Sequence, residues 1–281
     1  MTRPAFIRQP GPPATQRRVA VPCRGTALRL RLKAGERLLD AVAQGFAQAG
    51  FDSGVAELPA LALNPFAYVM PAPARDAQHA AFYSQPFAPP GVARLHEGAI
   101  TFGVRDGAPF FHAHALWREA DGKECGGHIL PETTRLAEDA EVDAFGLDGA
   151  RFEATQDPET NFKLFEPVAA PANRRGERPA LALRLRPNVP FAPTLQALAQ
   201  EAGVARWRAR GGVGSLIGAR FESGEVIENF ATEVFLRASQ GSGSSVQIGL
   251  VDMAGAVRRG PIASQDNPVL MTFELCLVEE E

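Results

Sequence analysis

Three of the chain's five histidines lie in one short stretch, FFHAHALWREADGKECGGHILPE, from Phe110 to Glu132. His112 and His114 are two residues apart in a run that is typical of a β-strand. Side chains at this spacing point to the same face of a sheet, about 6.5–7 Å apart along the strand. Imidazole nitrogens on one face are ligands for zinc, and equally for nickel, copper or iron. The pair therefore indicates a metal site if a third ligand joins it.

The third ligand depends on a turn. Ala120–Gly122, with the sequence Ala-Asp-Gly, predicts a three-residue hairpin loop, because glycine supplies the positive φ that its last position needs. If Glu119 and Lys123 close this loop, His114 lies directly opposite His128. Three neutral imidazoles beside an open position are the ligand set of a catalytic type of zinc site. We therefore predict that His112, His114 and His128 bind a metal.

The same register places Cys125 on the opposite face, so it is not expected to be a fourth ligand. Acidic residues near this stretch, Glu97, Glu124 and Glu132, are candidates for a general acid or base beside the metal. The alternative is a hydrogen-bonded imidazole cluster at a subunit interface, which would titrate at about pH 6–7.

The elements that must position these side chains occur twice in the chain. LRLRLKAGERLLDAVAQGFAQAGF from Leu28 aligns with LALRLRPNVPFAPTLQALAQEAGV from Leu181, each a strand followed by a helix that ends at Gly50 or Gly203. GKECGGHILPETTRLAEDAEVDAF, near the end of the first copy, aligns with GAVRRGPIASQDNPVLMTFELCLV in the second. The segment MPAPARDAQHAAFYSQPFAPPG is present only in the first copy.

Each copy has one helix followed by several short alternating runs, which predicts an α+β fold: two tandem homologous domains, each a largely antiparallel or mixed sheet with a covering helix. We predict a flexible N-terminal arm over 1–25 and a domain with the histidines over 26–168. A linker over 169–178, rich in Pro, Ala and charge, then leads to a histidine-free domain over 179–281.

Composition narrows the function. The 281 residues carry a formal net charge of −3, so no basic field over the whole chain attracts nucleic acid or an anionic membrane. The three cysteines are far apart and form no CxxC motif, which argues against a disulfide framework. No apolar segment is long enough to span a membrane. We expect a cytoplasmic protein.

HAH, a DG turn and GGHILP, preceded by the helix GERLLDAVAQGFAQAGF, resemble the plants-and-prokaryotes conserved (PPC) domain family over most of both copies. This resemblance implies an α+β fold, trimeric assembly and a metal, usually zinc, on His112, His114 and His128. The fold is shared with acetolactate decarboxylase, a zinc enzyme. Plant members join the domain to a DNA-binding AT-hook, but RRGERP here has Glu177 between Gly176 and Arg178, which breaks the Gly-Arg-Pro core.

The two copies depart from the family pattern in complementary ways. The second has no histidine, yet GGVGSLIGARFE from Gly211 resembles the family's GxGS segment, where the first copy reads AELPALALNPFAY. One hypothesis is that the loop of Gly211, Gly212, Gly214 and Ser215 lies beside the histidines, from the same chain or a neighbour. The alternative is simple decay of one copy after duplication.

Two functions are therefore expected. The first is a metal-binding protein with a binding or regulatory role, in which DNA association is implied only by the resemblance and is not supported by the net charge. The second is a zinc-dependent enzyme, of lyase or hydrolase type, acting on a small carbonyl or carboxylate compound. An enzyme requires a concave pocket with a convergent acid, base or arginine beside the metal, whereas DNA binding requires a continuous basic face.

Overall fold

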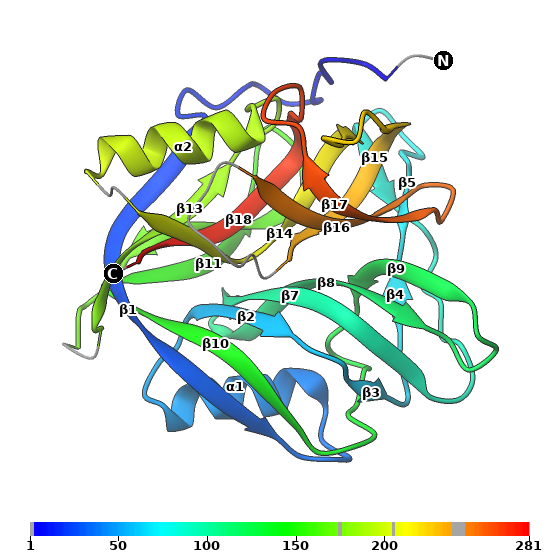
Figure 1. The fold of residues 1–281 in the computed structure, drawn as a ribbon, viewed down its shortest axis with the longest axis vertical. Coiled ribbons are helices and arrows are strands. Elements are labelled where there is room, and N and C mark those ends of the chain that lie inside the picture. Colours follow the sequence, from blue (N-terminus) through cyan, green and yellow to red (C-terminus); the bar gives the residue numbers. More distant parts are fainter. Residues whose placement is uncertain (1–2, 174–175, 204–205, 238–244, 281) are drawn as a thin grey trace.

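The computed structural model describes residues 3–173, 176–203, 206–237 and 245–280. In these residues the chain is mostly antiparallel β-sheet with two short helices, as Figure 1 shows. The first half of the chain contains β1 (Arg18–Leu32), α1 (Leu38–Gln48), β2 (Gly54–Leu58), β3 (Ala62–Leu63), β4 (Tyr68–Val69), β5 (Pro71–Pro73), β6 (Ala81–Tyr83), β7 (Ala93–Arg105), β8 (Ala108–Arg118), β9 (Glu124–Ile129), β10 (Ala140–Asp148), β11 (Ala150–Gln156) and β12 (Lys163–Ala169). The second half contains β13 (Arg178–Leu185), α2 (Phe191–Glu201), β14 (Trp207–Arg220), β15 (Val226–Leu236), β16 (Val246–Asp252), β17 (Val257–Ile262) and β18 (Val269–Glu279).

The strand order is the same in the two halves. From the middle of the sheet outward, the first half runs β1-β10-β2-β7-β8-β9 and the second runs β13-β18-β14-β15-β16-β17. The halves are joined by antiparallel pairing of β1 with β13, from Arg18 opposite Leu185 to Gly25 opposite Arg178. The pairing of β11 with β7 is parallel. The two copies therefore contribute to one continuous sheet rather than to two separate ones.

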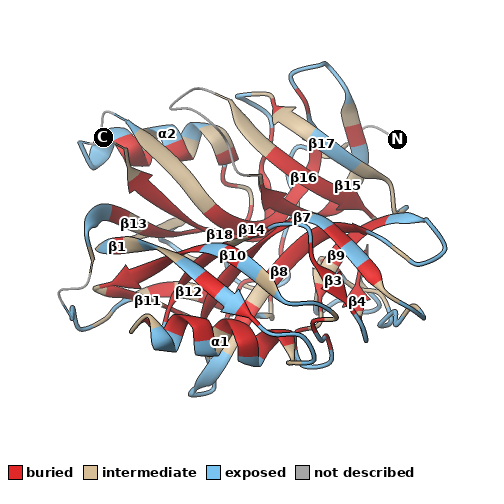
Figure 2. Cartoon of the chain, turned by 60° about the horizontal axis from the view of Figure 1, so that its bottom comes forward, coloured by how far each residue is buried: buried red, intermediate tan, exposed pale blue. Residues whose placement is uncertain are grey.

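Each helix buries one face against its own half of the sheet, and α1 and α2 lie on opposite outer sides of the molecule (Figure 1). Val42 and Phe46 of α1 are fully buried, as are Phe191 and Leu195 of α2. The chain leaves α1 through Gly50 at φ +82° and α2 through Gly203 at φ +69°, which confirms the predicted helix ends. Neither helix in the described part of the chain is long and apolar enough to cross a membrane. Figure 2 shows the buried residues concentrated in the strands between these helices.

The predicted N-terminal arm over residues 1–25 is in part a strand of the sheet. Residues 18–25 belong to β1, because their backbone pairs with β13 in the middle of the sheet. Upstream, Gln9 is buried and donates from Nε2 to the Leu270 carbonyl at 2.8 Å, and Arg17 forms an ion pair with Glu159 at 2.7 Å. Of the predicted linker over 169–178, Ala169 ends β12 and Arg178 begins β13, and residues 174 and 175 lie outside the described part of the chain.

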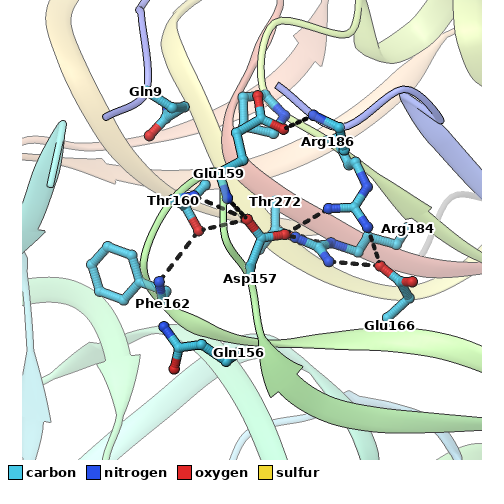
Figure 3. Close-up of polar contacts among 12 residues, drawn as sticks. Gln9, Gln156, Asp157, Glu159, Thr160, Phe162, Glu166, Arg184, Arg186 and Thr272 are labelled. Carbon is cyan, nitrogen blue, oxygen red and sulfur yellow. Dashed lines mark hydrogen bonds and ion pairs between the residues drawn. The ribbon is translucent and has the colours of Figure 1, made fainter. Parts of the chain in front are cut away.

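A buried ionic cluster fastens the β11–β12 hairpin to the second half (Figure 3). The side chain of Arg184 on β13 is only 1% exposed and pairs with Asp157 and with Glu166, the latter at 2.8 Å. Arg186 reaches the same two carboxylates. Burial alone would raise the pKa of Asp157, but the charge and hydrogen bond of Arg184 outweigh it and leave this pKa below its usual value.

Candidate metal centre

The hairpin of β8 and β9 has the predicted register. His114 pairs with His128, Glu119 N donates to the Lys123 carbonyl at 2.9 Å, and Gly122 has φ +91°. His112 lies beside His114 on the same face, with ring centroids 4.5 Å apart. One nitrogen from each of the three imidazoles lies within 4.8 Å of the others. The structure thus brings the three predicted ligands together.

The nitrogens that converge are Nε2 of His112, Nε2 of His114 and Nδ1 of His128. His112 Nε2 lies 2.9 Å from His114 Nε2, which in turn lies 3.3 Å from His128 Nδ1. In a tetrahedral site with metal–nitrogen bonds of about 2.0–2.1 Å, ligand nitrogens are about 3.3 Å apart. These two distances are therefore already close to the spacing that a bound ion requires.

Two of these rings are oriented by acceptors on the second half of the chain. His112 Nδ1 lies 2.8 Å from Glu274 Oε2, and His114 Nδ1 lies 2.9 Å from the Val234 carbonyl. In the tautomer that donates from Nδ1 to these acceptors, Nε2 is the ring nitrogen that remains to bind a metal. Ligand histidines in metal sites are usually held in this way by a carboxylate or a carbonyl.

The surroundings keep two of the histidines neutral. Burial lowers the pKa of His112 well below the usual value, with a further contribution from His114. Burial together with His112 and His114 does the same for the pKa of His128. His114 differs: burial lowers its pKa, but the carboxylate of Glu233 outweighs burial and the net shift is upward. Neutral imidazoles are the form that binds a metal.

Cys125 lies on the other face of β9, as the register predicted. It packs in the core of the first half with Trp117, whose side chain is fully buried. Burial raises the pKa of the Cys125 thiol to about 11, so it is not a thiolate near neutral pH.

Two carboxylates that were not predicted complete the cluster. Glu233 Oε2 on β15 lies 2.7 Å from His114 Nε2, and Glu274 on β18 contacts His112. Their side chains are 9% and 0% exposed. The signal in the sequence was one acid in each of two mainly apolar runs, FATEVFL and MTFELCL, because a buried carboxylate is unfavourable without a partner.

The proposed acids Glu97 and Glu132 lie elsewhere. A bulge in β7 between Leu95 and Glu97 disturbs the register there, and Glu97 pairs with Arg237 at 2.6 Å and with Arg259 at 2.8 Å. Glu132 is exposed in the turn after β9. Neither residue lines the cavity at the histidines, so neither is positioned to exchange a proton there.

The segment Gly211–Ser215 is not a loop but part of β14, in which two register shifts interrupt the pairing with β18. Gly214 and Ser215 line the same cavity as His112 and His114, within one chain. Gly211 and Gly212 do not line it; a Cβ on Gly211 would lie 2.3 Å from the side chain of Val55. The glycines therefore allow close packing between the halves at one end of the segment, and border the histidine cavity at the other.

The cavity has a volume of about 40 Å³ and lies where the two halves meet. The segment present only in the first copy contributes to its wall: β5 and β6 form a separate two-stranded sheet, and the Tyr83 ring lies 5.1 Å from the ring of His128. The lining residues come from seven parts of the chain and are Pro71, Ala81, Phe82, Tyr83, His112, His114, Phe162, Leu164, Gly214, Ser215, Ala231, Thr232, Glu233, Leu270, Met271 and Thr272.

No family model and no curated protein matches the chain. Among solved structures, a metal-containing protein from Archaeoglobus fulgidus is similar with 20% identity and a TM-score of 0.40, over 51% of this chain and 94% of that one. A plant- and prokaryote-conserved (PPC) protein from Pyrococcus horikoshii is similar with 20% identity and a TM-score of 0.40, over 52% and 95%. A candidate DNA-binding protein from Ralstonia eutropha has 14% identity and a TM-score of 0.34, over 50% and 90%. At these identities and scores, none of the three determines what this chain does.

Proposed function

We propose that the chain is a metal-dependent enzyme that binds one divalent transition metal, preferably zinc, on His112, His114 and His128. Its substrate is a small molecule that binds in the cavity beside these residues. The observation that carries this proposal is that His112, His114 and the carboxylate of Glu233 border one cavity, with the His128 ring beside them. A metal that only stabilised the fold would need neither the cavity nor the acid.

The donor set fits such an ion. Three imidazole nitrogens converge, and the outer nitrogens of His112 and His114 face acceptors that orient the rings. Three histidines leave room for a further ligand, which is the arrangement of catalytic rather than structural zinc sites. When bound, the metal supplies Lewis acidity toward an oxygen atom of the substrate.

The protein's own residues account for the rest of the chemistry. Glu233 lines the cavity and reaches the cluster, so its carboxylate can accept a proton from the substrate and return it. Glu274 is fully buried behind His112 and serves to position that ring. Apolar side chains from β6, β12 and β18 exclude bulk water, which strengthens electrostatic interactions inside the cavity.

A DNA-associated role has less support. His112 and His114 line a small cavity, and the formal net charge of −3 supplies no general attraction for phosphates. The AT-hook core is broken by Glu177.

The test is metal analysis of the full-length protein purified without a histidine tag. Wild type should hold about one metal equivalent, and His128→Ala should hold almost none, because two imidazoles bind a divalent ion much more weakly than three. His96→Ala is the matched control, since His96 is exposed and pairs with Glu124 away from the cluster. Equal metal content in wild type and His128→Ala would refute the proposal.

A further inference from the structure

The lining of the cavity separates into a polar end and an apolar end. The polar end holds His112, His114 and Glu233. The remainder is dominated by Phe82 on β6, Phe162 and Leu164 near β12, and Leu270 and Met271 on β18. A ligand that reaches the histidines must therefore place the rest of its surface against apolar side chains.

Charge defines the ligand further. Of the described residues that line the cavity, none is a lysine or an arginine, and the one ionisable acid among them is Glu233. Arg184, the buried cation near the site, donates to Thr272 at 3.3 Å but is already paired with Asp157 and Glu166. A carboxylate or phosphate on the ligand would thus have no side-chain cation to compensate it.

Two acidic side chains already lie beside the histidines. Glu233 contacts His114 at 2.7 Å and Glu274 contacts His112 at 2.8 Å. An anionic ligand would therefore be placed close to acidic side chains in a buried position whose described lining holds no cation. An uncharged ligand adds no charge there.

Tyr83 supplies a hydrogen-bonding group at the polar end. Its ring lies 5.1 Å from that of His128, and the residue lines the cavity. Burial raises the pKa of Tyr83 well above the usual value, and Glu233 and Glu274 add to this effect, so the phenol keeps its proton. It is therefore available to donate to an oxygen of the ligand.

The volume limits the size of the ligand. One water requires about 10–15 Å³ of such space, so a cavity of about 40 Å³ holds about three or four groups of that size. Phe82 at the cavity is 37% exposed, which leaves this side chain room to move outward when a ligand enters.

We propose that the cavity binds a small uncharged molecule with an apolar body and one oxygen function, such as a short alcohol, ketone or amide, and discriminates against carboxylates. This inference rests on the proposed function, because the oxygen is directed at the metal-binding histidines. It departs from the sequence-based expectation, which admitted a carboxylate compound equally.

The test uses the full-length protein loaded with Co²⁺, whose visible absorption reports on its ligands, titrated with propionamide and with propionate. The two probes have nearly the same shape and differ by one negative charge. We expect propionamide to bind at least about tenfold more tightly. Glu233→Gln removes the carboxylate from the lining and should reduce this preference by raising the affinity for propionate.

The outcomes separate the two proposals. A protein that takes up no Co²⁺ would refute the proposed function and this inference with it. A protein that binds Co²⁺ but prefers propionate, or responds to neither probe, would overturn the inference alone. If Glu233→Gln does not fold, the wild-type comparison still decides, and Tyr83→Phe provides a second variant, in which the affinity for propionamide should fall.

Discussion

Asp157→Asn tests the buried ionic cluster that joins the two halves. Asp157 and Arg184 each have side chains 1% exposed, and the substitution leaves Arg184 with Glu166 as its remaining acidic partner. Asparagine preserves the shape and can still accept from the backbone N–H groups of Glu159 and Thr160, both at 3.0 Å. The change therefore removes mainly the charge.

Removing one partner of a buried ion pair typically costs about 3–5 kcal/mol, because it leaves the other charge uncompensated. We expect the free energy of unfolding of Asp157→Asn to fall by this amount at pH 7. The measurement is urea unfolding, followed by the fluorescence of Trp117, which is fully buried in the native state. Asp143→Asn is the control: its carboxylate pairs with Arg29 at 2.7 Å, but both side chains are more than half exposed, so we expect a loss of at most about 1 kcal/mol.

The pH dependence of the free energy of unfolding tests the direction of this effect. The folded-state pKa of Asp157 lies below the ordinary value of 3.8, so the folded state releases this proton more readily than the unfolded chain. The resulting stability is fully present above pH 3.8 and is lost as pH falls through the lower, folded-state value. The difference between wild type and Asp157→Asn should therefore shrink below pH 3.8. A difference at pH 7 no larger than that of the control would refute the reasoning.

Four other measurements follow from the structure. Gly214→Ala should lower the free energy of unfolding by about 1–3 kcal/mol, and with it the melting temperature, because the new Cβ would lie 2.3 Å from the Thr272 carbonyl oxygen. An unchanged melting temperature would contradict this close packing. The cysteines of the native protein should resist alkylation by iodoacetamide at pH 8, which mass spectrometry would measure. Burial raises the pKa of Cys23 to about 12 and that of Cys125 to about 11, and it raises the pKa of Cys276 well above its usual value. Rapid labelling of the native protein would count against this. Free zinc at about 100 times its dissociation constant should stabilise the protein by about 2.7 kcal/mol in thermal unfolding, and a chelator should reverse the effect. Trimeric assembly stays a prediction from the resemblance, and light scattering would test it.

The success of the local predictions has a physical reason. The positions of Gly50, Gly203 and Gly122 could be predicted because each needs a positive φ, which glycine adopts without steric cost. The pairing of His114 with His128 followed from the turn and the alternation of the strands. These features depend on interactions over a few residues, which the sequence displays directly.

Predictions failed where distant pairing decides the structure. Arg18–Gly25 looked like part of a loose arm, because its place in the sheet is created by β13, far along the chain. Glu97 seemed near enough to the histidines to act as an acid, but a bulge in β7 disturbs its register, and arginines from the second half pair with it.

The sequence by itself therefore determined the histidine hairpin: which three imidazoles share a face, in which register, and that Cys125 points away from them. Only the tertiary structure decided what faces those imidazoles. His112 meets Glu274 across 162 residues of chain, and that contact exists because the two halves pack their apolar faces together. Such packing is the sum of many non-directional contacts, so no short motif encodes it. Only the folded chain therefore shows the acid and the cavity that make this set of ligands a candidate active site.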